Sequence, residues 1–97
     1  MKRFELTNKA KEDLKGIARY TQNHWGRKQR LRYLKQLDLA FIQLAKSPDM
    51  AANCNDIKSG YRYIPCGSHL IFYKSLNQND IVIVRVLHKR MALEHWL

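Results

Sequence analysis

Apolar side chains recur every three or four residues in two long stretches of the chain, which is the period of an amphipathic helix. Thr7 and Asn8 precede the first stretch, and their side-chain oxygens suit a helix N-cap. The first stripe comprises Ala10, Leu14, Ile17, Ala18 and Thr21. Gly26 interrupts the pattern, and Pro48 ends the second stretch because it disfavours helix at Ser47. The second stripe comprises Arg30, Leu34, Leu37, Phe41, Leu44 and Ala45. Two helices joined by a short turn predict an αα-hairpin.

Outside the helices, short runs of apolar and β-branched residues are typical of strands. A first strand is predicted at residues 3–6, and the polar, Asn-rich segment 50–60 is interpreted as a loop. Three further strand candidates follow it, "YRYIPC", "HLIFYK" and "IVIVRVLH", with connections short enough for hairpins. Pro65 lacks an amide donor, which predicts an edge strand or a bulge. The continuous apolar run "IVIV" predicts a central strand that is covered on both faces.

These elements predict an α+β fold, in which a small antiparallel β-sheet packs against the N-terminal αα-hairpin in the order β-α-α-β-β-β. The first strand must then join the sheet from the far end of the sequence. Ninety-seven residues are enough for one core. We therefore expect a single domain that spans residues 1–97.

The charge of the chain is strongly unbalanced, with 18 Lys and Arg against 8 Asp and Glu, a net charge of +10. A positive field of this kind attracts acidic partners and speeds their encounter. The N-terminus has no apolar targeting segment, and no apolar run is long enough to span a membrane. Cys54 and Cys66 lack the spacing of a redox or zinc motif. We expect a cytoplasmic protein with reduced thiols and no membrane association.

The most basic stretch is "GRKQRLRYLK", residues 26–35. It could form a phosphate-binding face or a solvated helix surface that docks protein. The chain has no helix-turn-helix, RNA-recognition or zinc-finger signature, so we favour the second interpretation over direct nucleic-acid binding. Arg30 falls on the apolar stripe, which predicts that its guanidinium is paired inside the protein or at an interface.

A second set of cations could converge at one side of the meander, namely Arg62, His69, Lys89 and Arg90. Such a basic patch suits an anion, and phosphodiester cleavage would use its members as base, acid and charge stabiliser. The set contains no carboxylate, so we assign no catalytic residue. The four histidines show no helical i, i+4 pair and no neighbouring cysteine, and we expect no metal.

Four stretches along the chain together resemble one known family. They are the A-x-x-D-L at residues 10–14, the Trp-Gly at 25–26, "SHLIFY" at 68–73 and the R-V-L-H-x-x-M at 85–91. The chain resembles the ParE branch of the RelE/ParE superfamily of bacterial toxins. The resemblance implies a toxin of a type II toxin–antitoxin system that binds DNA gyrase, blocks replication and is neutralised by an acidic ParD-type antitoxin. It implies no enzymatic activity, no cofactor and no small-molecule substrate.

The resemblance also implies where partners bind. In relatives the antitoxin wraps over the helix hairpin, so the candidate antitoxin contacts are Tyr20, Trp25, Arg30, Tyr33, Leu37 and Phe41. The C-terminal region is implicated in gyrase binding, so the candidate gyrase contacts are Lys89, Arg90, Met91 and Trp96.

The alternative is a RelE-like, ribosome-dependent mRNA endoribonuclease that uses the basic patch. RelE-type toxins have a catalytic tyrosine near the C-terminus, where this chain has Trp96. An indole cannot act as a general acid, and Ile64 stands near a position that RelE-type toxins fill with lysine. Both differences favour the gyrase inhibitor over the ribonuclease.

Overall fold

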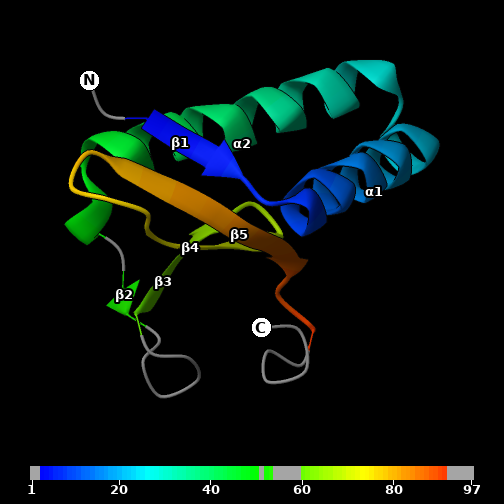
Figure 1. The fold of residues 1–97 in the computed structure, drawn as a ribbon. Coiled ribbons are helices and arrows are strands. Elements are labelled where there is room, and N and C mark those ends of the chain that lie inside the picture. Colours follow the sequence, from blue (N-terminus) through cyan, green and yellow to red (C-terminus); the bar gives the residue numbers. More distant parts are fainter. Residues whose placement is uncertain (1–2, 51, 54–59, 92–97) are drawn as a thin grey trace.

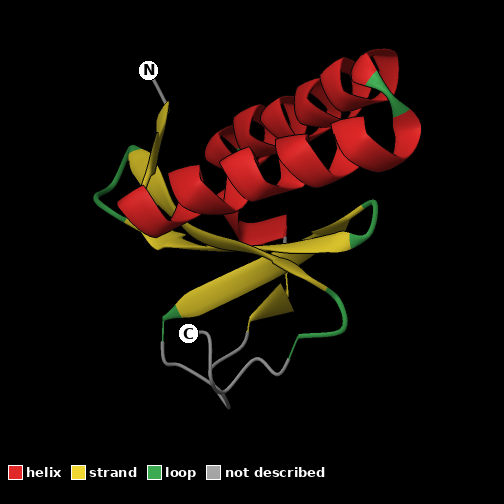
Figure 2. Cartoon of the chain, turned by 90° about the vertical axis from the view of Figure 1, so that its right-hand side faces the viewer, coloured by secondary structure: helices red, strands yellow, loops and turns green. Residues whose placement is uncertain are grey.

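The computed structural model describes residues 3–50, 52–53 and 60–91, and Figure 1 shows their arrangement. The elements are β1 (Arg3–Leu6), α1 (Asn8–Trp25), α2 (Arg27–Lys46), a 3₁₀ turn η1 (Pro48–Met50), β2 (Ala52–Asn53), β3 (Tyr61–Cys66), β4 (His69–Ser75) and β5 (Asp80–His88). The two helices form a hairpin that covers one face of the sheet (Figure 2). The predicted α+β fold is confirmed.

The sheet has the strand order β1-β5-β4-β3-β2. The meander of β3, β4 and β5 is antiparallel, as predicted. The prediction of a wholly antiparallel sheet was wrong at β1, which runs parallel to β5 with Phe4 opposite Ile81. Thr7 holds this direction, because its amide donates to the Ile83 carbonyl at 3.1 Å and its hydroxyl to the Val84 carbonyl at 2.7 Å.

Two details of the meander follow from its sequence. The segment interpreted as a loop contains the two-residue strand β2, which pairs with β3 only at Arg62 and Tyr63. Pro65 lies beyond that pairing, so within the described residues no strand flanks it on the side of β3 away from β4. Its missing amide donor therefore costs no ladder hydrogen bond to a further strand.

The main core lies between the helices and the sheet. The stripe of α2 supplies Leu37, Phe41, Leu44 and Ala45, all at most 3% exposed. The run "IVIV" contributes Ile81 and Ile83 to the same cluster, as predicted for an interior strand. A second, smaller cluster on the other face of the sheet centres on Tyr61, Phe72 and Leu87.

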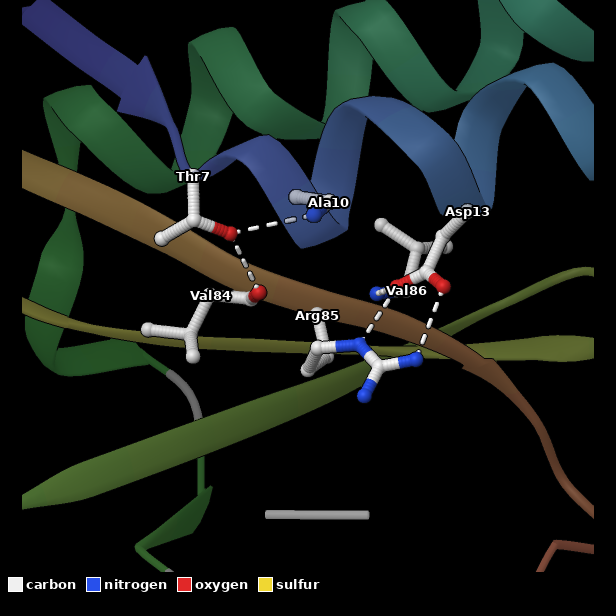
Figure 3. Close-up of polar contacts among 6 residues, drawn as sticks. All are labelled: Thr7, Ala10, Asp13, Val84, Arg85 and Val86. Atoms are coloured by element: carbon white, nitrogen blue, oxygen red, sulfur yellow. Dashed lines mark hydrogen bonds and ion pairs between the residues drawn. The ribbon is translucent and has the colours of Figure 1, made fainter.

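An ion pair fixes α1 to β5, as Figure 3 shows. Arg85 donates from Nε to Asp13 Oδ2 at 2.8 Å and from Nη2 to Oδ1 at 2.9 Å. The backbone amide of Val86 donates to the same Oδ2 at 3.0 Å. The two side chains are only 11% and 15% exposed, and the hydrogen bond with Asp13 raises the pKa of Arg85. Two hydrogen bonds from Arg85 and one from Val86 therefore join α1 to β5, across 72 and 73 positions in sequence.

Replacing Asp13 should destabilise the fold strongly. Asp13→Ala leaves the mostly buried Arg85 guanidinium and the Val86 amide without their shared acceptor. We expect the free energy of unfolding to fall by about 3 kcal/mol in urea denaturation. The matched control is Asp38→Ala, an exposed carboxylate on α2, which should change it by less than about 0.5 kcal/mol. Equal losses in the two variants would contradict the assignment.

Candidate functional site

A cavity of about 960 Å³ opens between α1, the start of α2, the β3–β4 turn and the end of β5. Its apolar lining includes Ile17, Val86 and Met91, and its polar lining includes Thr21, Gln29 and Ser68. Asp13 lines the cavity and is held by Arg85, so the position of α1 against β5 determines the shape of the cavity.

Large aromatic side chains stand exposed at the rim of this cavity. Tyr20 is 60% exposed and Trp25 is 71% exposed, and both line the cavity. Tyr20 stacks on the imidazole of His24, with ring centroids 3.9 Å apart. Exposed aromatic groups beside a concave surface are typical of protein docking sites, because they bury large apolar area with little loss of conformational entropy.

The cavity brings together residues that the sequence assigned to different partners. Tyr20, Trp25 and Tyr33 were predicted antitoxin contacts, Met91 was a predicted gyrase contact, and His69 belonged to the predicted basic patch; all five line the cavity. The other predicted contacts lie elsewhere.

Burial removes two of the predicted antitoxin contacts from the surface. Leu37 is 0% exposed and Phe41 is 2% exposed, because both belong to the face of α2 that packs on the sheet. Arg30 lines a second, smaller cavity. Lys89 and Arg90 are exposed just beyond β5, and the predicted gyrase contact Trp96 lies outside the described residues.

Tyr33 holds α2 against the turn between β3 and β4. Its hydroxyl accepts from the Ser68 amide at 3.1 Å, donates to the Cys66 carbonyl at 3.1 Å, and lies 2.6 Å from Nδ1 of His69. Its ring covers Gly67, whose φ is +58° and where a Cβ atom would lie 2.5 Å from the ring. Only glycine fits this turn beneath the tyrosine.

Burial controls the titration of this cluster. It raises the pKa of Tyr33 and lowers that of His69 to about 4, with a further lowering by the neighbouring His88. His69 is therefore neutral at pH 7. Tyr33 and His69 share one hydrogen bond, and the imidazole tautomer determines whether the hydroxyl or Nδ1 donates in it.

The expected convergence of the basic patch was wrong for Arg62. The tight turn at Gly67 places His69 opposite Cys66, whereas Arg62 is four residues further along β3, about 13 Å away. Arg62 instead lies 3.8 Å from the exposed carboxylate of Asp49. Lys89 does adjoin His69, because its amide donates to the carbonyl of Ser68.

Sequence reasoning missed the ion pair of Asp13 with Arg85. It also missed the contact of His88 with His69, whose ring centroids lie 5.5 Å apart, edge to face. Asp13 carried a usable signal, since it lies three residues after Ala10 and four before Ile17, on the apolar stripe of α1.

Among the described residues, no group of three or more His, Cys, Asp or Glu could hold a metal ion. No helix within the same ranges is sufficiently long and apolar to cross a membrane.

The stability of the protein should depend on pH through His69. The unfolded chain protonates near pH 6.5 and the folded one near 4, so the contribution of His69 is complete above pH 6.5 and is lost as the pH falls towards 4. We expect His69→Gln to remove about 1–2 kcal/mol of the stability difference between pH 7.5 and 4.5, after discounting for partial exposure. Urea denaturation at both pH values measures it, and an unchanged pH dependence would contradict the assignment.

Comparisons with known proteins agree with this geometry. Residues 4–93 match the family described as ParE toxin of type II toxin–antitoxin system, parDE. Toxin ParE1 of Mycobacterium tuberculosis is 36% identical over 92 residues, which cover 95% of this chain and 94% of that protein. Toxin ParE1 of Caulobacter vibrioides is 34% identical over 91 residues, with 94% and 93% covered. Toxin ParE of Escherichia coli is 31% identical over 93 residues, with 96% and 90% covered.

A solved structure shares the fold. The structure described as the chromosomal ParDE TA system from P. aeruginosa superposes with a TM-score of 0.77 at 18% identity, over 91% of this chain and 96% of the other. At this identity the likeness concerns the fold alone, whereas the matches in sequence extend over almost the whole chain. The chain therefore belongs to the ParE family of toxins of type II toxin–antitoxin systems.

Proposed function

We propose that this ParE-family toxin inhibits DNA gyrase by binding it, without catalysis, and is neutralised by an acidic ParD-type antitoxin in the cytoplasm. The observation that carries the proposal is the cavity with exposed aromatic side chains, which joins the helix hairpin to the end of β5. Such a surface suits a protein partner, and the proposed site needs no cofactor and no small-molecule substrate.

The titratable groups at the cavity favour binding over catalysis. Asp13 is engaged by Arg85, and the hydroxyl of Tyr33 is engaged by the β3–β4 turn. His69 has a pKa of about 4, too low for an effective general base or acid near neutral pH. These groups support the fold, which weakens the alternative of a RelE-like mRNA endoribonuclease.

Charge and shape favour an acidic antitoxin. The net charge of +10 would draw an acidic segment towards the toxin, and the aromatic side chains at the rim would anchor its apolar face. Met91 lines the same cavity, and Lys89 and Arg90 are exposed directly before it in sequence, where we place the gyrase contact. An antitoxin that covers the rim would lie close to that contact.

Purified protein should inhibit supercoiling by purified gyrase and leave ribosome-bound mRNA intact. Reversing the exposed charges in Lys89→Glu/Arg90→Glu should weaken inhibition by at least about tenfold, because two cations at the contact would become two anions. The matched control is Lys9→Glu/Lys11→Glu, the same change at two exposed positions of α1, which should inhibit as the wild type does.

Two results would overturn the proposal. Cleavage of ribosome-bound mRNA together with unaffected gyrase would favour the endoribonuclease. Equal loss of gyrase inhibition in both double variants would show that overall charge, and not the end of β5, determines binding.

A further inference from the structure

The chain bends sharply directly after β5, and two exposed cations lie at the tip of the bend. The Met91 amide donates to the His88 carbonyl at 3.0 Å, which closes a four-residue β-turn with Lys89 and Arg90 at its two central positions. The Lys89 amide donates to the Ser68 carbonyl at 3.1 Å, so this turn is also tied to the turn between β3 and β4. We call residues 88–91 the cationic turn.

One side-chain contact holds the second half of the cationic turn. The Arg90 amide donates to Nδ1 of His88, two residues earlier, at 3.1 Å. Asn and Asp side chains make the same contact with the amide two residues on in Asx turns. This chain contains such a turn before β5, where Oδ1 of Asn77 accepts from the Asn79 amide at 2.8 Å. His88 therefore does for the turn after β5 what Asn77 does for the turn before it.

The orientation of the His88 imidazole is set by the wall of the main cavity. Its half-buried ring meets the ring of His69 edge to face, with centroids 5.5 Å apart. The two residues also lie opposite each other in the ladder of β4 and β5. His69 is held in turn by the Tyr33 hydroxyl, which lies 2.6 Å from its Nδ1. The acceptor that His88 offers to the cationic turn is thus aimed by groups that line the cavity.

We propose that His88 is a positioning residue for the proposed gyrase contact, and that it presents Lys89 and Arg90 by accepting the Arg90 amide at an unprotonated Nδ1. This inference rests on the proposed function where it concerns gyrase, whereas the positioning itself is a property of the free toxin. His88 acts through the two residues that follow it, so the role does not require its ring to touch gyrase.

The hydrogen bond exists in only one protonation state of His88. Nδ1 accepts through its lone pair, so the neutral ring carries its proton on Nε2, and a second proton on Nδ1 would set two donors against each other. The other titratable and charged groups around the ring come from three elements and from the turn itself, namely Glu12, Asp13, Tyr33, His69, Lys89 and Arg90. The carboxylates favour the second proton and the two cations oppose it. Histidine side chains ordinarily change charge between pH 8 and 5, so acid should open the turn at Arg90.

Two substitutions of His88 separate its acceptor from the rest of the side chain. Asn and Leu have nearly the same shape, but only Asn offers an oxygen to the amide two residues on. At pH 8, His88→Asn should inhibit supercoiling by gyrase within about twofold of wild type. His88→Leu should inhibit about three- to tenfold more weakly, which is the loss expected for one hydrogen bond.

Nuclear magnetic resonance of the free, nitrogen-15-labelled toxin tests the positioning without gyrase. At one fixed pH of 8, the Arg90 amide should exchange with water about three- to tenfold faster in His88→Leu than in wild type and His88→Asn. When the pH is lowered to 5, the Arg90 amide proton of wild type should move upfield with the same midpoint as the His88 ring protons. It should keep its position in His88→Asn, and the Met91 amide, which is bonded to a backbone carbonyl, should move less. A merely structural role of His88 predicts none of these differences between Asn and Leu.

The contrary outcomes fall on different claims. Equal exchange of the Arg90 amide in wild type and both variants overturns the positioning role itself. Equal inhibition of gyrase by the two variants, with the Arg90 amide protected only in His88→Asn, overturns the link between the turn and gyrase and leaves the proposed function intact. Failure of wild type to inhibit gyrase overturns the proposed function, and the exchange measurements then still decide whether His88 positions the cationic turn.

Discussion

The carboxylate of Asp13 is the constraint on which the position of the helix hairpin depends. It accepts three hydrogen bonds from β5, two from Arg85 and one from the backbone of Val86. Thr7 adds two further bonds to β5 just before α1 begins, and its hydroxyl also accepts from the Ala10 amide to cap the helix. The first helix is thereby fixed in direction and in register along the strand, which apolar packing alone would leave free to slide.

That constraint determines what the main cavity can do. One wall belongs to α1 and the opposite wall to the end of β5 and the β3–β4 turn, so the ion pair sets their separation. Tyr33 then fixes the start of α2 to the same turn. Because the polar groups are used to hold these walls, the accessible features are shape and exposed aromatic area. A docking surface follows from this arrangement more directly than a catalytic centre does.

Much of the fold could be predicted because its signals are local. The two apolar stripes, Gly26 and Pro48 define the helices, and "IVIV" identifies an interior strand. The parallel direction of β1 depends on hydrogen bonds from Thr7 to β5, which no local pattern reveals. The place of Arg62 depended on the register of the β3–β4 hairpin, which the turn at Gly67 sets.

Amide hydrogen exchange of the toxin, alone and with its ParD-type antitoxin, tests the docking surface most directly. We predict slower exchange on binding at the hairpin turn around Trp25, at the β3–β4 turn and at residues 88–91, which surround the main cavity. Exchange in β2 and in the first half of β3, on the far side of the sheet order, should not change. Protection confined to β2 and β3, with none around the cavity, would contradict the account.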